Sequence, residues 1–357
     1  MNTAQTVKTY TGNTLYLAWQ VLVQNQPRLR ARDAAKVLEV SEAELLASRI
    51  GIDCVRLQPD WGKLLLALEN FGDVMALTRN EYCVHERKGV YLSPQIAANN
   101  KMGLVVSSEI DLRFFLSGWK TVFALTEITN QGERYSIQFF DDAGMAVHKV
   151  YLTSSSNIAY WPVFLSKFTH PEQNNCLEVN QLDTEHNELK DAQVDIEGLR
   201  KHWSELKDTH HFFAMLKKFQ VTRTQALRLA GAAWAEPLSN DALPNFLEQA
   251  AQQEQDIMIF VGNAHCVQIH SGKINNLRWY GEWFNILDER FNLHLKASAI
   301  AQLWRVRKPT TDGIVTSWEA FDSSGELIIQ IFGVRKPGIP ELRNWRILAE
   351  SFPVLEV

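Results

Sequence analysis

Short runs of β-branched and aromatic residues recur along most of the chain, separated by Gly, Ser and Asp residues. Runs of this length, bounded by turn-forming residues, predict β-strands. Because one run follows another without a helical crossover, we expect the strands to pair antiparallel. The predicted strands cover residues 74–79, 82–86, 121–127, 135–140, 257–262, 266–270, 314–321 and 327–333.

Two other segments, residues 32–48 and 212–229, place apolar residues three and four positions apart and are rich in Ala, Leu and Lys. That spacing predicts helical structure at the start of each half of the chain. Helices followed by consecutive strands are typical of the α+β class. We therefore expect each half to be a large antiparallel β-sheet flanked by α-helices.

A sequence repeat relates the two halves. Residues 73–89 and 256–272 align without a gap at an offset of 183 (256 − 73 = 183), with Asp, Met, Asn, Cys, Val and Gly identical. Residues 140–144 resemble 321–325 at an offset of 181 (321 − 140 = 181). This pattern predicts a tandem duplication of a unit of about 180 residues. We expect an N-terminal unit at 1–168, a polar, acidic linker at 169–194 and a C-terminal unit at 195–357.

Composition and charge narrow the class of protein. The net charge of -5 argues against nucleic-acid binding by bulk electrostatics. The sequence contains no apolar stretch of the roughly 20 residues that a membrane span needs, and its start is polar, so we expect neither a membrane-embedded protein nor a signal peptide. The four cysteines lie far apart, as in a cytoplasmic protein with reduced thiols. The 11 tryptophans fit an aromatic-lined pocket and, equally, large β-sheets.

The segment from Asp208 to Lys218 carries the most informative chemistry. Asp208 is a candidate N-cap, which would place His210 in the first turn of a helix, where the helix dipole favours the neutral, metal-ligating imidazole. Phe213 follows three residues later on the same face and could lie against a flat ligand. The alternatives are a surface pair, His210 with His211, at a helix end, or part of a hydrolase triad whose nucleophile is not marked.

Basic residues form a second group of candidates. Residues 304–309 (WRVRKP) and 332–338 (FGVRKPG) place Arg and Lys beside Gly and Pro, which suits anion binding but also a solvated basic turn. Arg113 stands beside two phenylalanines, so it either faces a ligand or pairs with an acid such as Glu109 or Asp111.

Several of these segments together resemble one known family. The motifs are DxHxFFxML with TR (208–223), IMIFVGN (257–263), FNLHL (291–295), WRVRKPTTDG (304–313), FGxRKPGxPEL (332–342), TRNE (78–81) and IDLRFF (110–115). As a set they are similar to the hemin-degrading and hemin-transport proteins of the HemS/ChuS type, which are cytoplasmic proteins of Gram-negative bacteria. The resemblance covers nearly the whole chain except the linker.

The resemblance implies a pair of similar halves with a heme cleft between the halves, holding one heme b (iron protoporphyrin IX) per chain. It assigns the axial iron ligand to His210 and the distal, catalytic position to Arg113. It assigns pocket positions to Phe115, Phe213, Phe260 and Phe332 and propionate or rim cations to Arg223, Lys308 and Arg335. In two places the sequence departs from the pattern: His211 follows the ligand directly, and Phe332 stands where a tyrosine is expected.

The function implied is that of a cytoplasmic heme-binding protein of heme uptake and iron acquisition, which promotes oxidative heme degradation and iron release. The alternative is a heme chaperone that passes intact heme to a separate heme oxygenase. An arginine on the distal side favours oxygen activation over storage. The implied partners are heme, an inner-membrane heme importer and a heme oxygenase or reductase, with no nucleic acid.

Overall fold

The computed structural model describes residues 10–27, 29–130, 132–180, 188–335 and 338–355. Within these residues the chain divides into two compact units. The first unit contains the described parts of residues 1–78, 88–183 and 263–266, and the second those of 79–87, 184–262 and 267–357.

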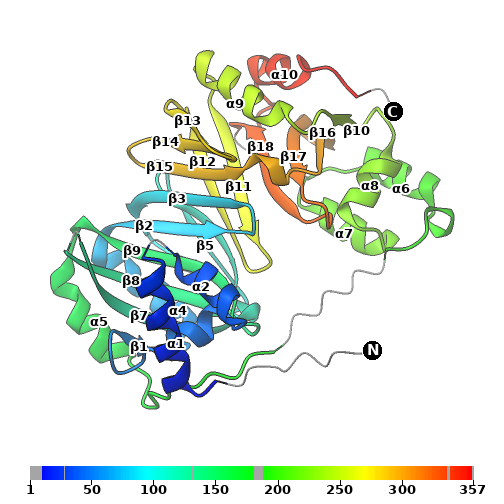
Figure 1. The fold of residues 1–357 in the computed structure, drawn as a ribbon. Helices are drawn as coiled ribbons and strands as arrows, with labels where there is room; N and C mark the ends of the chain where they lie inside the picture. The colour runs from blue at the N-terminus through cyan, green and yellow to red at the C-terminus, as the bar shows by residue number, and fades with distance from the viewer. Residues whose placement is uncertain (1–9, 28, 131, 181–187, 336–337, 356–357) are drawn as a thin grey trace. The chain divides into compact units, whose positions relative to one another are not determined.

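Helices and antiparallel strands make up the first unit (Figure 1). The strands pair in the order β1-β7-β8-β9-β2, and β6 pairs with β5 and β5 with β4. Its core contains fully buried phenylalanines from helices and strands alike. The elements are α1 (Gly12–Asn25), α2 (Ala31–Leu38), α3 (Glu42–Ala47), β1 (Cys54–Arg56), α4 (Trp61–Ala67), β2 (Gly72–Arg79), β4 (Gln95–Ile96), β5 (Met102–Val106), β6 (Asp111–Phe115), β7 (Trp119–Thr129), β8 (Gly132–Asp141), β9 (Ala146–Ser156) and α5 (Trp161–Phe168).

The second unit has the same organisation. Its strands pair in the order β10-β16-β17-β18-β11-β12, and a second group in the order β3-β15-β14-β13. The elements are β3 (Cys83–Val90), α6 (Ile196–Ser204), α7 (His211–Phe219), α8 (Arg223–Ala230), β10 (Ala235–Leu238), α9 (Ala242–Gln252), β11 (Ile257–Asn263), β12 (Cys266–Gly272), β13 (Leu277–Tyr280), β14 (Trp283–Leu287), β15 (Phe291–Lys296), β16 (Gln302–Thr310), β17 (Gly313–Phe321), β18 (Leu327–Gly333) and α10 (Arg343–Glu350). Short 3₁₀ turns complete the two units: η1 (Leu68–Phe71), η2 (Leu116–Gly118), η3 (Ile158–Tyr160), η4 (Asp191–Gln193) and η5 (Ala297–Ala299).

The predicted α+β fold and its duplication are confirmed by these elements. The repeated segments at 73–89 and 256–272 form β2 with β3 and β11 with β12. Elsewhere β8 and β17 begin 181 residues apart (313 − 132 = 181), as do β9 and β18 (327 − 146 = 181). All eight predicted strands overlap strands of the structure, with Tyr82 alone outside, and β8 pairs antiparallel with β7 and β9, as β17 does with β16 and β18.

The two predicted helical segments are each divided, a break that the periodicity did not predict. Residues 32–48 form α2 and α3, and residues 212–229 form α7 and α8. Glu39 (φ 57°) and Gln220 (φ 52°) adopt the left-handed conformation at the ends of α2 and α7. A residue in this conformation ends a right-handed helix, and its N–H bonds back to the last carbonyls.

The predicted linker and the predicted unit boundaries do not coincide with the division of the structure into two compact units. The described residues 169–180 contain no helix or strand, yet Gln173 donates to the Arg56 carbonyl and the Asn180 N–H to that of Asp142. The second unit includes residues 79–87 and the first includes 263–266. The boundaries at 168 and 195 therefore stay predictions about where the sequence repeat begins and ends. The two compact units of the structure are divided at other residues.

Asparagines at equivalent repeat positions hold the two exchanged segments. Asn80 and Asn263 are 183 residues apart (263 − 80 = 183). Asn80 Nδ2 donates to the Ile328 carbonyl at 2.7 Å in the second unit, and Asn263 Nδ2 donates to the Val147 carbonyl at 2.9 Å in the first. Each unit therefore contains a turn that comes from the other half of the sequence.

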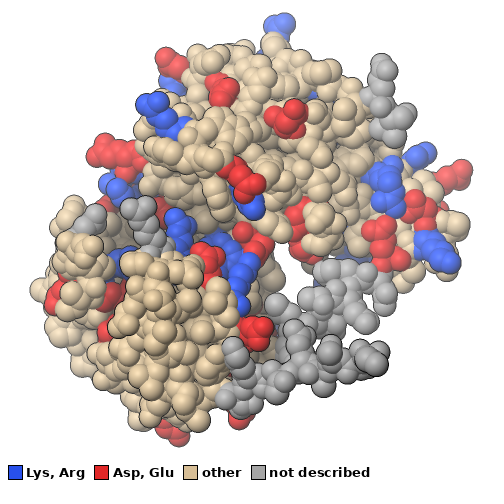
Figure 2. Space-filling view, in the orientation of Figure 1, with Lys and Arg blue, Asp and Glu red and all other residues tan. Residues whose placement is uncertain are grey.

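No helix in the described parts of the chain is long and apolar enough to cross a membrane. On the face shown in Figure 2, basic and acidic side chains are interspersed, so neither sign forms a broad field there.

Candidate functional site

Helix α7 and the turn before it position His210. Helix α7 packs against α6 through Phe212, whose ring centroid lies 4.8 Å from that of Trp203. The helix begins at His211, and His210 is its N-cap residue, with no side-chain capping bond. Asp208, which we predicted to be the N-cap, instead directs its carboxylate at His210: Oδ1 accepts from His210 N at 2.8 Å and lies 2.6 Å from Nδ1. The predicted cap was wrong because this carboxylate bonds His210 instead of the helix N–H groups.

The Asp208 contact selects one tautomer of His210. The hydrogen bond from the His210 backbone lowers the pKa of Asp208, which is therefore ionised at neutral pH. An ionised carboxylate only accepts hydrogen bonds, so Nδ1 of the ring must be the donor. In the neutral ring, Nε2 then carries the lone pair, which is the arrangement of histidines that bind metals with a carboxylate behind them. The side chain is 90% exposed, and no described residue bonds Nε2.

The residues after His210 present an aromatic surface. Phe213 is 65% exposed, and the Lys217 ammonium lies 4.8 Å from its ring centroid. These positions follow His210 by three and seven residues and share its face of the helix. His211 is also exposed, so exposure does not distinguish the two histidines. The side-chain hydrogen bond to Asp208 distinguishes them, because His210 makes it.

A pocket of about 530 Å³ lies along α7 toward its C-terminal end, and His210 is not among the residues that line it. Phe213 and Lys217 line it from α7, Arg223 from the start of α8 and Gly325 from the turn between β17 and β18. Two of the predicted site residues, Phe213 and Arg223, are thus brought together by the fold. The lining also includes Glu188 and Glu326, so the pocket offers aromatic, cationic and carboxylate groups to a ligand.

Two predicted rim cations, Arg223 and Lys308, converge on a carboxylate that was not predicted from the sequence. Glu319 is fully buried; Arg223 Nε donates to it at 2.8 Å and Lys308 Nζ at 2.6 Å. Burial raises the pKa of this carboxyl, but the two cations outweigh it and hold that pKa well below its usual range. Burial lowers the pKa of Lys308 to about 8. Both cations also lie over the ring of Phe212, at 5.2 and 4.6 Å from its centroid.

This carboxylate changes the roles that Arg223 and Lys308 can play. The Lys308 side chain is 3% exposed, so it neutralises Glu319 and stands behind Arg223, whose side chain is 26% exposed. A glutamate as the one charged residue of the predicted strand 314–321 was the available sequence signal, since a buried acid needs cationic partners.

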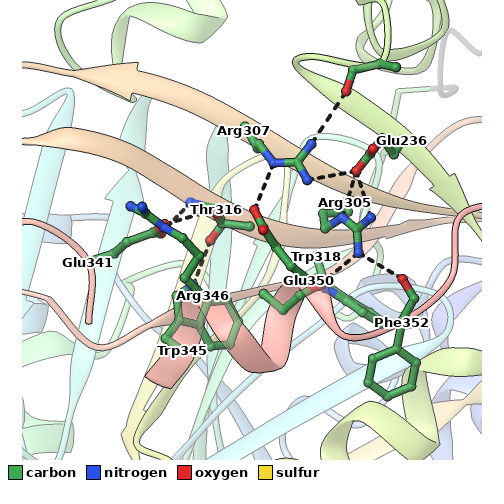
Figure 3. Close-up of polar contacts among 12 residues, drawn as sticks. Glu236, Arg305, Arg307, Thr316, Trp318, Glu341, Trp345, Arg346, Glu350 and Phe352 are labelled. Carbon is green, nitrogen blue, oxygen red and sulfur yellow. Dashed lines mark hydrogen bonds and ion pairs between the residues drawn. The ribbon is translucent and has the colours of Figure 1, made fainter. Parts of the chain in front are cut away.

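The two arginines of the WRVRKP segment, Arg305 and Arg307, bind neighbouring elements of the fold (Figure 3). Arg305 binds Glu236 and the carbonyls of Ala349 and Phe352, and Arg307 binds Glu236 and Glu350. The segment is strand β16 rather than a basic turn. These two cations hold α10 and β10 to the sheet, and they do not form the anion site that the sequence suggested.

The remaining predicted residues of the second unit lie on neighbouring strands or beyond them. Phe260 on β11 and Phe332 on β18 are directly adjacent, with ring centroids 5.0 Å apart in an edge-to-face arrangement. Arg335 follows β18, and its side chain is 24% exposed with Nη1 3.8 Å from Asp312.

Arg113 and Phe115 lie on β6 of the first unit. The Arg113 guanidinium forms an ion pair with Asp111 and donates to the Leu112 carbonyl at 3.1 Å, and its side chain remains 36% exposed. Of the two acids considered, Asp111 is thus a partner that the structure shows. Burial raises the pKa of Asp111, against the effect of this cation. Phe115 is also 36% exposed, and its N–H donates to the His265 carbonyl at 3.0 Å.

Fold and site together define a duplicated α+β protein with an exposed, carboxylate-bound histidine at the start of α7 and a pocket further along the same helix. A family model described as "Haemin-degrading HemS.ChuX domain" matches twice, at residues 39–168 and 220–352. The chain belongs to this family.

Two hemin transport proteins are similar in sequence along nearly the full length of the chain. The chain is 42% identical over 334 residues to "Hemin transport protein HmuS" of Yersinia pestis, covering 93% of this chain and 95% of that protein. It is 41% identical over 336 residues to "Hemin transport protein HemS" of Yersinia enterocolitica, covering 94% and 96%.

Solved structures show the same fold. The holo form of PhuS, described as a heme-binding protein from Pseudomonas aeruginosa, is similar with a TM-score of 0.96 and 57% identity over 97% of this chain and 100% of that one. ChuS, described as an E. coli heme oxygenase, is similar with a TM-score of 0.85 and 38% identity over 95% and 99%.

Proposed function

We propose that this chain binds one heme b, with His210 as the iron ligand, and promotes its oxidative degradation in the cytoplasm during heme uptake and iron acquisition. The observation that carries the proposal is the Asp208–His210 pair, which leaves Nε2 exposed on the helix face of Phe213, a residue that lines the α7 pocket. The relatives named as hemin transport, heme-binding and heme oxygenase proteins support it.

The residues of the second unit fit a heme by their chemistry. Asp208 orients the His210 ring through the Nδ1–H bond. The exposed ring of Phe213 and the adjacent rings of Phe260 and Phe332 offer apolar surface to a porphyrin. Arg223 and Arg335 retain exposed surface for propionates, while Lys308 supports Arg223 through Glu319.

Arg113 is the proposed distal residue and the one expected to favour degradation. When bound, the heme supplies the iron and the conjugated ring for dioxygen chemistry. The Arg113 guanidinium can donate hydrogen bonds to a small ligand while Asp111 holds one end of it. Its fixed positive charge stabilises negative charge without losing a proton.

The second candidate function is that of a heme chaperone. The observation that favours it is the 90% exposure of the His210 side chain at a helix end, which gives a partner direct access to the ligand. In this case a separate heme oxygenase would receive the intact heme. An inner-membrane heme importer as donor and a reductase as electron source complete the proposed set of partners.

One experiment decides between the two functions. The heme complex, prepared at one equivalent per chain, is incubated in air with a reductant and catalase while the Soret band is followed. For the degrading function we expect loss of the band and a ring-opened tetrapyrrole, with the rate reduced at least about tenfold in Arg113→Leu, as for loss of one preorganised donor. An unchanged band and intact heme would favour the chaperone, and a titration without a break at one equivalent would contradict heme binding as proposed.

A further inference from the structure

A chain of four buried polar side chains crosses the core of the first unit. Tyr91 Oη lies 2.6 Å from His148 Nε2, His148 Nδ1 lies 2.8 Å from Thr78 Oγ1, and Thr78 Oγ1 lies 3.4 Å from Cys266 Sγ. All four residues are at most 1% exposed. We refer to Tyr91, His148, Thr78 and Cys266 as the core polar chain.

The second repeat has apolar residues at the equivalent places. Thr78 corresponds to Val261 (78 + 183 = 261), Tyr91 to Ile274 (91 + 183 = 274) and His148 to Ile329 (148 + 181 = 329). These three residues are at most 1% exposed and belong to the hydrophobic core of the second unit. The same fold is therefore built without the polar chain, so the fold itself does not require it.

The core polar chain lies directly beneath strand β6. The His148 ring packs against Phe114 with ring centroids 5.7 Å apart. Successive strand residues point to opposite faces, so Phe114 faces the core while its neighbours Arg113 and Phe115 face away. The burial of these residues agrees, since Phe114 is fully buried and Phe115 is 36% exposed.

Cys266, at the other end of the core polar chain, lies next to a residue that holds the C-terminal end of β6. Cys266 follows His265, whose carbonyl accepts hydrogen bonds from the Phe115 N–H at 3.0 Å and from Trp119 Nε1 at 3.2 Å. A Cβ added to Gly118 would collide with the His265 ring, so this turn is closely packed. Thr78, through Cys266, and His148, through Phe114, thus fix β6 at two points.

We propose that the core polar chain is a positioning device for Arg113: it fixes the register and tilt of β6 so that the guanidinium points consistently toward the ligand. Hydrogen bonds are directional, whereas apolar packing tolerates small rotations, so a bonded core specifies one strand position. The repeat that carries Arg113 has the polar chain, and the repeat with His294 at that position (113 + 181 = 294) does not. The inference rests on the proposed function of Arg113.

The test gives the first repeat the core of the second. The triple variant carries Thr78→Val, Tyr91→Ile and His148→Ile. The polar groups that it removes are hydrogen-bonded to one another, so among the members of the core polar chain only Cys266 loses a partner and remains. We expect this core variant to fold, because replacing a whole buried polar network by apolar residues is often neutral. The single variant Tyr91→Phe, which keeps the ring, replaces it in every measurement if the triple variant fails to fold.

Azide affinity of the ferric heme complex is the measured quantity, because it reports a distal hydrogen-bond donor and not catalytic turnover. We expect Arg113→Leu and the core variant each to weaken azide binding by about tenfold, and the combined variant to weaken it no further. Hemin affinity itself should change less than twofold in the core variant. In ligand-free protein, the ¹⁵Nε signal of Arg113 should broaden or shift in the core variant.

Additive losses in the combined variant, or a core variant with wild-type azide affinity, would overturn the proposal. Equal losses of hemin and azide affinity in the core variant would also overturn it, since they indicate general structural damage. If the wild-type chain bound no hemin, the proposed function would fail first. An unchanged ¹⁵Nε signal of Arg113 in the ligand-free core variant would then separately overturn the positioning role.

Discussion

At the residue scale, the candidate site shows what a single sequence can and cannot reveal. His210 was marked by its neighbours Asp208 and Phe213, and the structure places both in contact with it or on its helix face. The cap assignment failed because an Asp two residues before a His can bond that His instead of the helix. Glu319 and its pairing with the two predicted cations were missed because the chain separates it from Arg223 by 96 residues and from Lys308 by 11.

His210 and His211 can be separated by single substitutions. Their side chains point about 100° apart on a helix, so both cannot face one iron in the same pose. We expect His210→Ala to weaken hemin affinity by at least about tenfold, which is about 1.4 kcal/mol, or to change the Soret spectrum strongly. His211→Ala is the matched control and should leave both nearly unchanged. The reverse outcome would move the ligand assignment by one residue.

Buried His148 gives the stability of the protein a specific dependence on pH. Burial lowers its pKa to about 3, while the unfolded chain has the ordinary value near 6.5. Between these values the unfolded chain binds the extra proton, so the free energy of unfolding falls as pH decreases from about 6.5 toward 3, by about 1.4 kcal/mol per pH unit. Urea unfolding of wild type and His148→Phe at pH 7, 6 and 5 measures this contribution.

The slope should be smaller in His148→Phe, even though the variant loses the bonds to Tyr91 and Thr78 and is less stable at pH 7. Burial also lowers the pKa of His270 to about 3, and that residue keeps part of the slope in both proteins. Parallel slopes for the two proteins would show that His148 is not buried in the neutral form.

At the scale of elements, strands were predictable and helix ends were not. A buried strand needs β-branched and aromatic residues in a short run, and all eight predicted runs are strands. The breaks at Glu39 and Gln220 carry no such signal, because neither residue is the Gly or Asn that usually adopts the left-handed conformation. Among the strands that were not predicted, β4 and β13 are edge strands of two and four residues, too short to show a period.

Gln220 offers a test at this scale. A non-glycine residue in the left-handed conformation costs about 1–2 kcal/mol, and glycine removes that cost while adding flexibility to the unfolded chain. We expect Gln220→Gly to raise the free energy of unfolding by about 0.5–1 kcal/mol, measured by urea titration. Ala214→Gly, at an exposed position inside α7, is the control and should lower it by about 1 kcal/mol. A loss of stability in Gln220→Gly would contradict the account of the helix break.

At the scale of the whole molecule, the repeat was visible in the sequence, but the exchange of segments was not. A constant offset reports equivalent positions and says nothing about which unit a hairpin joins. Residues 79–87 and 263–266 belong to the units of the opposite halves. Their turns contain Asn80 and Asn263, whose bonds to carbonyls could be recognised only in three dimensions.

A chain expressed as two pieces, 1–183 and 184–357, should therefore remain associated. Each compact unit needs a segment supplied by the other piece. With a tag on one piece, we expect the other to co-purify in equal amounts, and gel filtration should give one peak at the mass of the whole chain. Asn80→Ala with Asn263→Ala should weaken this association. Separate elution of two folded pieces would contradict a need for the exchanged segments.

The unequal cores of the two repeats have a consequence for how such a protein can evolve. In a symmetric assembly of identical subunits, every substitution occurs in each subunit. A polar core that benefits one subunit would therefore also replace the apolar core of the other. Once two copies share one chain, each position is inherited separately, and one copy can keep Val261, Ile274 and Ile329 while the other acquires Thr78, Tyr91 and His148. Gene fusion thus permits the half that carries Arg113 to have a hydrogen-bonded polar core while the half that carries His210 retains an apolar interior.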